Sequence, residues 1–115
     1  MMFGRKRTNE VGPADVAELQ GRGAVLLDVR ENDEWTAGHA PYAVHVPLSR
    51  VGEAASRFAV QEVLTVCRSG ARSGRAAKTL AAAGVEVHNV AGGMSAWASA
   101  GLPVVRDDGS PGRVS

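Results

Sequence analysis

The amino-acid sequence predicts an α/β fold with a mostly parallel β-sheet and helices on both of its faces. The chain has 115 residues, which is enough for one domain. Several short, continuous apolar runs have the composition of strands that are buried on both faces. These runs alternate along the chain with helical segments that end at glycines, and such alternation is typical of parallel sheets.

The first elements follow from proline, glycine and apolar residues. A helix is expected to begin at Pro13, because proline suits the first helical turn, and to end before Gly21. The apolar run at 24–29 is predicted to be the first strand. One or two helical turns at 32–37 are expected to end at Gly38.

The middle of the chain continues the same alternation. A brief strand is predicted at 44–46, closed by Pro47, and a helix at 49–58 with Ser49 as its N-cap. The β-branched run at 62–67 is the best-defined strand of the sequence.

The last elements are an Ala-rich helix at 75–83, a strand at 85–90 and a short helix at 94–100. Gly92 and Gly93 are read as a turn that requires unusual backbone dihedrals. Residues 1–9 are expected to be a flexible N-terminus, and residues 106–115, rich in Asp, Gly, Ser and Pro, a disordered tail.

Composition limits the partners and the compartment. Thirteen Lys and Arg against twelve Asp and Glu leave a formal charge of +1, so neither nucleic acid nor a membrane is expected as a partner. A single cysteine permits no intramolecular disulfide. No apolar run follows the basic N-terminus as in a secretory signal, and none is long enough to span a bilayer. We therefore expect a cytoplasmic protein.

Cys67 is the candidate reactive centre, because it lies at the carboxyl end of the best-defined strand, where α/β sheets bind ligands. The segment that follows it is made of small residues between two arginines: Arg68, Ser69, Gly70, Ala71, Arg72 and Ser73. Small residues let the loop wrap tightly and point its backbone N–H groups inward, which creates an anion-binding nest. The same field favours the thiolate of Cys67 and lowers its pKa.

Basic residues dominate the start of the next helix, against the local preference for acids there. For Arg68 and Arg72, contact with a bound anion is the favoured reading. For Arg75 and Lys78, anion contact and simple exposure on a solvated helix face are equally good explanations.

Four motifs in order resemble those of the rhodanese-type sulfurtransferases and together cover about residues 10–105. The motifs are Leu27-Asp28-Val29-Arg30 with Gly38-His39-Ala40-Pro41, Val46-Pro47-Leu48, the Cys67–Ser73 loop, and Gly92-Gly93-Met94 with Trp97. The resemblance implies a three-layer, rhodanese-like domain at 10–105 with about five strands. The family usually has a glycine where Tyr42 stands, which is expected to alter the turn.

The resemblance also implies that Cys67 cycles between thiol and persulfide without a cofactor. The thiolate would take the outer sulfur of a small anion such as thiosulfate, and then pass it to cyanide or to a low-molecular-weight or protein thiol. Backbone N–H groups of Arg68 to Ser73 would stabilise the anionic sulfur, and the side chains of Arg68 and Arg72 would hold the oxyanion of the donor.

Other polar residues are predicted to have structural roles. Asp28 and Arg30 are favoured as an ion pair over rim residues, and His39 as a hydrogen-bonding turn residue. No interaction partner for His45 or His88 can be named from the sequence. Three scattered histidines and one cysteine do not predict a metal site.

Three other functions remain open. A non-catalytic persulfide carrier or docking module would need the same cysteine. Cysteine-dependent phosphatases place five residues between cysteine and arginine, whereas four separate Cys67 from Arg72 here. An arsenate reductase normally requires a second thiol, and glutathione would have to supply it.

Overall fold

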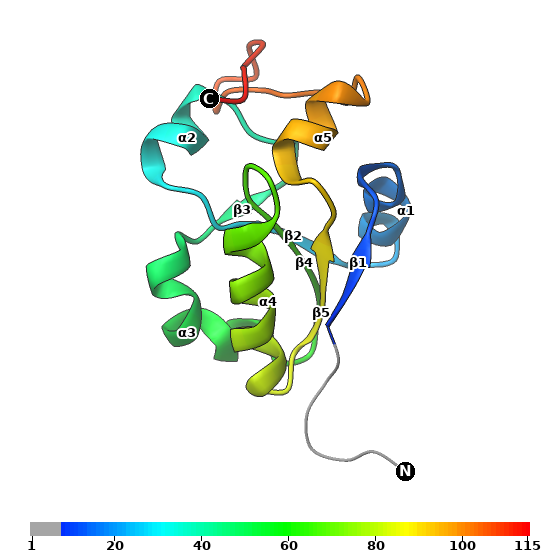
Figure 1. Ribbon diagram of the computed structural model, residues 1–115, viewed down its shortest axis with the longest axis vertical. Coiled ribbons are helices and arrows are strands. Elements are labelled where there is room, and N and C mark those ends of the chain that lie inside the picture. The colour runs from blue at the N-terminus through cyan, green and yellow to red at the C-terminus, as the bar shows by residue number, and fades with distance from the viewer. Residues whose placement is uncertain (1–7) are drawn as a thin grey trace.

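The computed structural model describes residues 8–115 and contains a five-stranded sheet at its centre (Figure 1). All paired strands run parallel, in the order β1-β5-β4-β2-β3. The strands are β1 (Thr8–Val11), β2 (Val25–Asp28), β3 (Val44–His45), β4 (Glu62–Val66) and β5 (Glu86–Val90). The predicted parallel sheet of about five strands is therefore confirmed.

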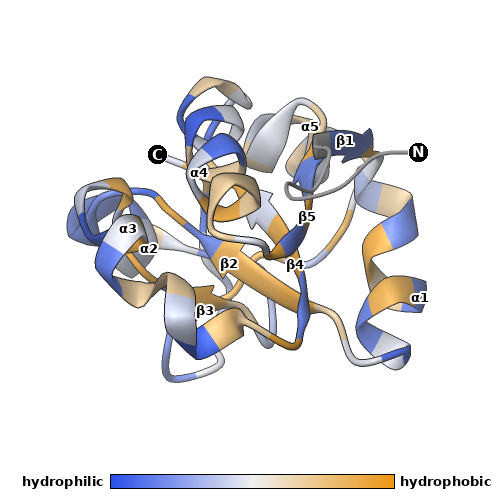
Figure 2. Cartoon of the chain, turned by 90° about the horizontal axis from the view of Figure 1, so that it is seen from below, coloured by the Kyte–Doolittle hydropathy of each residue, from blue (hydrophilic) through white to orange (hydrophobic). Residues whose placement is uncertain are grey.

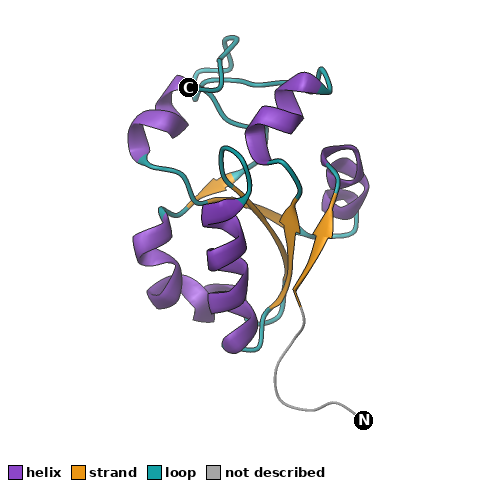
Figure 3. Ribbon diagram, in the orientation of Figure 1, coloured by secondary structure: helices purple, strands orange, loops and turns teal. Residues whose placement is uncertain are grey.

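Helices cover both faces of this sheet (Figure 3). They are α1 (Val16–Gly21), α2 (Asn32–Ala37), α3 (Val51–Ala54), α4 (Ala71–Ala82) and α5 (Gly93–Ser99). Short 3-10 turns precede α1 and flank α3. The α3 and α4 helices lie on one face, and α1 and α5 on the other, which makes the three layers.

The core is split by the sheet, because neighbouring strand residues point to opposite faces. Leu27, Val63 and Cys67 pack with α3 and α4, whereas Leu26 and Leu64 pack with α1 and α5. Figure 2 shows the apolar central strands enclosed between these helices. The side chain of Cys67 thus points toward α4, the helix that follows it.

The first strand is the main element that the sequence did not predict. The β1 strand pairs with β5 from Thr8↔Val87 to Val11↔Val90, so Thr8 and Asn9 belong to the sheet and not to a flexible end. Its residues are mostly polar because an edge strand needs no continuous apolar run. The rest of the predicted flexible segment, residues 1–7, lies outside the described residues.

Two helix boundaries also differ from the predictions. Ser49 makes no capping hydrogen bond, because the turn begins after Pro47 and Ser49 lies inside the 3-10 segment Leu48–Arg50. The α4 helix begins at Ala71 and not at Arg75, because Gly70 adopts a left-handed conformation that starts the helix early. Arg72 and Ser73 therefore lie in its first turn and not in the preceding loop.

The C-terminal segment 106–115 is folded back on the domain, where composition predicted disorder. The backbone N–H of Gly112 donates to Val104, and that of Arg113 donates to Ala37, at 2.9 and 3.0 Å. Turn-forming residues can be ordered when a neighbouring segment takes up their hydrogen bonds, and composition does not reveal that neighbour.

Two further features concern the surface. Tyr42 has a φ of 64° and is 91% exposed, which explains why glycine suits this turn. Within residues 8–115, no helix is both long enough and apolar enough to cross a membrane.

Candidate active site

Cys67 directly follows β4 and begins the loop that leads into α4. Its side chain is only 1% exposed, although the loop itself lies at the carboxyl edge of the sheet between α2 and α5 (Figure 1). A buried thiolate is stable only if donors replace water, so the surroundings of Sγ decide its chemistry.

Donors from the loop and from the first turn of α4 converge on the sulfur. The N–H of Gly70 lies 3.1 Å from Sγ, and the hydroxyl of Ser73 donates to Sγ over 3.2 Å. Burial raises the pKa of the Cys67 thiol, but the Ser73 hydroxyl and the backbone N–H groups of Ser73, Gly70 and Ser69 outweigh it. The net pKa of Cys67 is lowered, which makes the thiolate easier to form, as the small-residue loop predicted.

Glycine at position 70 makes this geometry possible. Its φ of 116° turns the chain sharply, and a residue with a Cβ would be strained there. The α4 helix begins directly afterwards and adds the positive end of its dipole to the field at Sγ. Thr65 on β4 donates to the carbonyl of Ser73 at 3.0 Å and thereby holds the first turn of α4 in place.

Neutral hydrogen bonds from β5 and α5 hold the outer side of the loop; we call these contacts the neutral brace, formed by Asn89, Gly93, Met94 and Ser95. The N–H of Met94 donates to the carbonyl of Cys67 at 2.7 Å, and that of Ser95 to the carbonyl of Arg68 at 2.9 Å. A Cβ at Gly93 would lie 2.4 Å from the Cys67 carbonyl oxygen, so only glycine fits. The predicted Gly92-Gly93 turn is confirmed, and this close approach gives it a further purpose.

Asn89 belongs to the brace and was not predicted from sequence. Its side chain is buried on β5 and donates to the carbonyl of Gly70 at 3.2 Å and to Glu10 on β1 at 3.1 Å. The signal that marks it is a polar residue within an otherwise apolar strand, since a buried amide requires partners.

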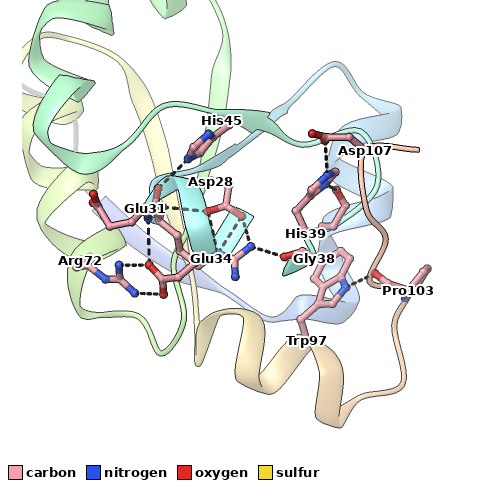
Figure 4. Close-up of polar contacts among 12 residues, drawn as sticks. Asp28, Glu31, Glu34, Gly38, His39, His45, Arg72, Trp97, Pro103 and Asp107 are labelled. Atoms are coloured by element: carbon pink, nitrogen blue, oxygen red, sulfur yellow. Dashed lines mark hydrogen bonds and ion pairs between the residues drawn. The ribbon is translucent and has the colours of Figure 1, made fainter. Parts of the chain in front are cut away.

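An ion pair holds the opposite side of the loop; we call it the charged clasp, formed by Glu34 of α2 and Arg72 of α4. Both terminal nitrogens of Arg72 donate to the Glu34 carboxylate, at 2.7 and 2.8 Å, and the two side chains point toward each other (Figure 4). The hydrogen bond from Arg72 lowers the pKa of Glu34 to about 2. Glu34 likewise raises the pKa of Arg72.

This clasp corrects the expected role of Arg72. The guanidinium was predicted to hold the oxyanion of a donor, but its two terminal nitrogens already bind Glu34. The sequence could not reveal this, because the partners are 38 residues apart. Arg68, Arg75 and Lys78 are exposed and form no ion pair with any residue from 8 to 115.

Asp28 and Arg30 form the ion pair that the sequence favoured. Both side chains are fully buried, the pair distance is 2.9 Å, and Arg30 also donates to the carbonyl of Gly38 at 2.7 Å. The pair therefore fixes the chain between β2 and the end of α2, and it does not face the rim.

The histidines also have structural partners. His39 is stacked on Trp35, with ring centroids 3.6 Å apart, and its Nε2 lies 2.8 Å from Asp107 of the C-terminal segment (Figure 4). His39 is thus a hydrogen-bonding turn residue, as expected. His45 Nε2 lies 2.7 Å from the carbonyl oxygen of Arg30.

Within residues 8–115, one group of possible metal ligands comes together, far from Cys67 at the amino ends of β4 and β5. Side-chain atoms of Glu62, Glu86 and His88 lie within 4.8 Å of one another. His88 Nε2 already bonds to Glu62 at 2.9 Å, and its buried Nδ1 has no partner in the described chain. Because a metal-bound histidine normally donates its second N–H, we interpret the group as a His88–Glu62 hydrogen bond with Glu86 nearby.

Known proteins are similar to this chain in sequence and in fold. The chain is 34% identical to thiosulfate sulfurtransferase 18 of Arabidopsis thaliana, and the match covers 91% of each chain. It is 40% identical to a candidate sulfur carrier protein of Bacillus subtilis, over 63% of this chain and 40% of that protein. The crystal structure of a rhodanese-related protein from Thermoplasma volcanium superposes with a TM-score of 0.77 at 28% identity, over 84% of this chain and 97% of that one.

Other relatives are longer. The chain spans 58% of a Synechocystis protein that is 36% identical to it, and 62% of a Bacillus subtilis protein that is 38% identical. The sequence model of the rhodanese-like domain family matches residues 12–100, which is most of the chain. Together with the parallel sheet and the Cys67 loop, this match shows that the chain belongs to the rhodanese-like family.

Proposed function

We propose that the protein is a sulfurtransferase that moves a sulfane sulfur through a persulfide on Cys67. In the first step the Cys67 thiolate attacks the outer sulfur of thiosulfate or of a persulfide donor, and sulfite or a thiolate leaves. In the second step a thiophilic acceptor, cyanide or a thiol, takes the outer sulfur and regenerates the Cys67 thiolate.

The observation that carries this proposal is the set of donors aimed at Sγ. Gly70 N–H and the Ser73 hydroxyl lie 3.1 and 3.2 Å from the sulfur, and they favour its anionic form. The backbone N–H groups of residues 68–73 are assigned the task of stabilising the anionic persulfide. Arg68 directly follows Cys67 and is exposed, and it is assigned to contact the sulfur donor. The mechanism assigns no protein base, since the donors around Sγ favour ionisation of the attacking thiol.

A persulfide carrier is the second candidate, because a relative is named as a candidate sulfur carrier. A carrier would load sulfur on Cys67 and then deliver it to the thiol of a partner protein, with slow turnover on small acceptors. A phosphatase is less well supported, because Arg72 would have to bind the phosphate and is held by Glu34. An arsenate reductase would need a resolving thiol from outside, since Cys67 is the single cysteine of the chain.

Intact-mass spectrometry after thiosulfate treatment tests the proposal. We expect the gain of one sulfur atom, its loss on addition of cyanide, and no gain in Cys67→Ser. A protein that takes up sulfur from neither thiosulfate nor a persulfide would contradict it. Steady-state thiocyanate production then separates the two candidates, because an enzyme turns over many times with cyanide and a carrier turns over poorly.

A further inference from the structure

The charge around Cys67 is lower than the sequence indicates. Arg68 of the loop and Arg72 of the first turn of α4 both follow Cys67 closely, but both terminal nitrogens of Arg72 are occupied by the two carboxylate oxygens of Glu34. The Glu34 side chain is only 15% exposed, and its pKa of about 2 keeps it ionised at neutral pH. The clasp therefore adds no net charge to the site.

Among the described residues, no other charge near Cys67 replaces the positive charge of Arg72 that Glu34 cancels. Arg68 is exposed, so water and salt screen its charge. The carboxylate of Glu31 lies within electrostatic reach of Arg72 and adds negative charge on the same side. Arg72 in turn is within electrostatic reach of Cys67, so whatever neutralises Arg72 is felt at the reacting sulfur.

We propose that Glu34 determines donor selectivity: by occupying Arg72, it makes the site prefer sulfane donors with one negative charge or none over the thiosulfate dianion. Alkyl persulfides are the chemical class that fits. This inference rests on the proposed sulfurtransferase function and names its donor.

The two reactions differ in the charge that meets the thiolate. With a persulfide, Cys67–S⁻ attacks the outer sulfur of R–S–SH; the new S–S bond forms Cys67–S–SH, the old S–S bond breaks, and R–S⁻ leaves with the electron pair. With thiosulfate, the same attack forms Cys67–S–S⁻ and releases SO₃²⁻, so a dianion must first approach a thiolate. A free arginine would lower that repulsion, and a neutralised one does not.

A pair of donors isolates this charge effect. Thiosulfate and methanethiosulfonate offer the same kind of outer sulfur, but the first carries two negative charges and the second carries one. We would measure kcat/KM for each donor with cyanide as acceptor, and express selectivity as the ratio of methanethiosulfonate to thiosulfate. Intrinsic differences between the donors cancel when this ratio is compared between variants. A third donor, 2-hydroxyethyl persulfide, represents the alkyl persulfides and should follow methanethiosulfonate.

Glu34→Gln is the decisive variant. Glutamine keeps an oxygen that can accept the Glu31 N–H, now 3.0 Å from Glu34, so the start of α2 is preserved while Arg72 regains its charge. We expect the selectivity ratio to fall roughly three- to tenfold, through faster reaction of thiosulfate. Arg72→Met should shift the ratio in the opposite direction, because it leaves Glu34 uncompensated.

Glu62→Gln is the matched control. It makes the same change in net charge at the amino end of β4, about 17 Å along the strand from Cys67. Its ratio should equal that of the wild type. Normal sulfur loading with one ratio in all variants would overturn the selectivity of Glu34 and leave the proposed function intact. Absence of sulfur loading from every donor would overturn both.

Discussion

The neutral brace and the charged clasp hold opposite sides of the same loop, but they use different physics. The brace consists of backbone and amide hydrogen bonds at 2.7–3.2 Å from β5 and α5, and it carries no charge of its own. The clasp is one ion pair between α2 and α4. The hydrogen bonds of the brace set the shape of the loop, and this shape is the same for every sulfur donor. The ion pair of the clasp also sets the electric field in the loop. Shape and donor preference are therefore separable by mutation.

Gly93→Ala should have the largest effect, because it breaks the brace where no space is left. A Cβ there would lie 2.4 Å from the carbonyl oxygen of Cys67, at a φ of 58°. We expect the free energy of unfolding to fall by about 2–4 kcal/mol, measured by chemical denaturation. Sulfur loading should fall for all donors alike.

Gly101→Ala is the control for that change. Gly101 has a φ of 76° but no atom within 4 Å of the added Cβ. It should lose only about 1 kcal/mol, the part that is due to backbone strain. Equal losses in the two variants would show that the close approach to Cys67 is unimportant.

The clasp should reveal itself in the acid stability of the protein. The pKa of Glu34 is about 2 in the folded state and 4.5 as a reference, so its stabilisation is complete above pH 4.5 and is lost as the pH falls through 2. The loss should be about 3 kcal/mol in the wild type by pH 2, and Glu34→Gln should lack it. Denaturation curves between pH 5 and 2 measure the difference. A wild type and variant with parallel pH profiles would contradict the ion pair.

Asn89→Ala tests whether the brace affects the pKa of Cys67. Loss of the amide frees the Gly70 carbonyl, so Gly70 N–H should hold Sγ less well and the pKa of Cys67 should rise. The pH dependence of alkylation by iodoacetamide reports this shift, and stability should fall by about 1–2 kcal/mol. Asn9→Ala, on the exposed edge of β1, should leave the alkylation profile unchanged. A merely structural Asn89 would lower stability without moving that profile.

Asp107→Ala should have the smallest effect, because it touches neither support of the loop. Asp107 lies 2.8 Å from His39 but is 73% exposed, and contacts between such exposed groups contribute about 1 kcal/mol or less. Thermal unfolding and sulfur loading should both be close to the wild type. A clear loss of loading would show that the C-terminal segment is a third support.

Local patterns predicted most of this structure. The apolar runs, Gly38 and Pro47 marked β2, α2 and β3, and the small residues after Cys67 marked the loop whose donors surround Sγ. What they missed depends on contacts through space. The β1 strand is polar because it lies at an edge, and the C-terminal segment is ordered by bonds to Val104 and Ala37.

The site shows the same division. The lowered pKa of Cys67 was predictable because the donors to its sulfur follow within six residues along the chain. The engagement of Arg72 was not, since nothing near position 72 shows that an acid from α2 will reach it. Asn89 could be suspected only from its polarity, because the two groups to which its amide donates come from β1 and from the loop.

The position of Glu34 has a consequence for protein engineering. A designer who transplants the segment from Cys67 to Ser73 into another scaffold would transfer the donors around Sγ. The acid that neutralises Arg72 would be left behind, because Glu34 lies 38 residues upstream of Arg72. The grafted loop would carry one more exposed positive charge than the original. Its substrate range would then follow the host's counterpart of α2, so the two segments have to be moved as one unit.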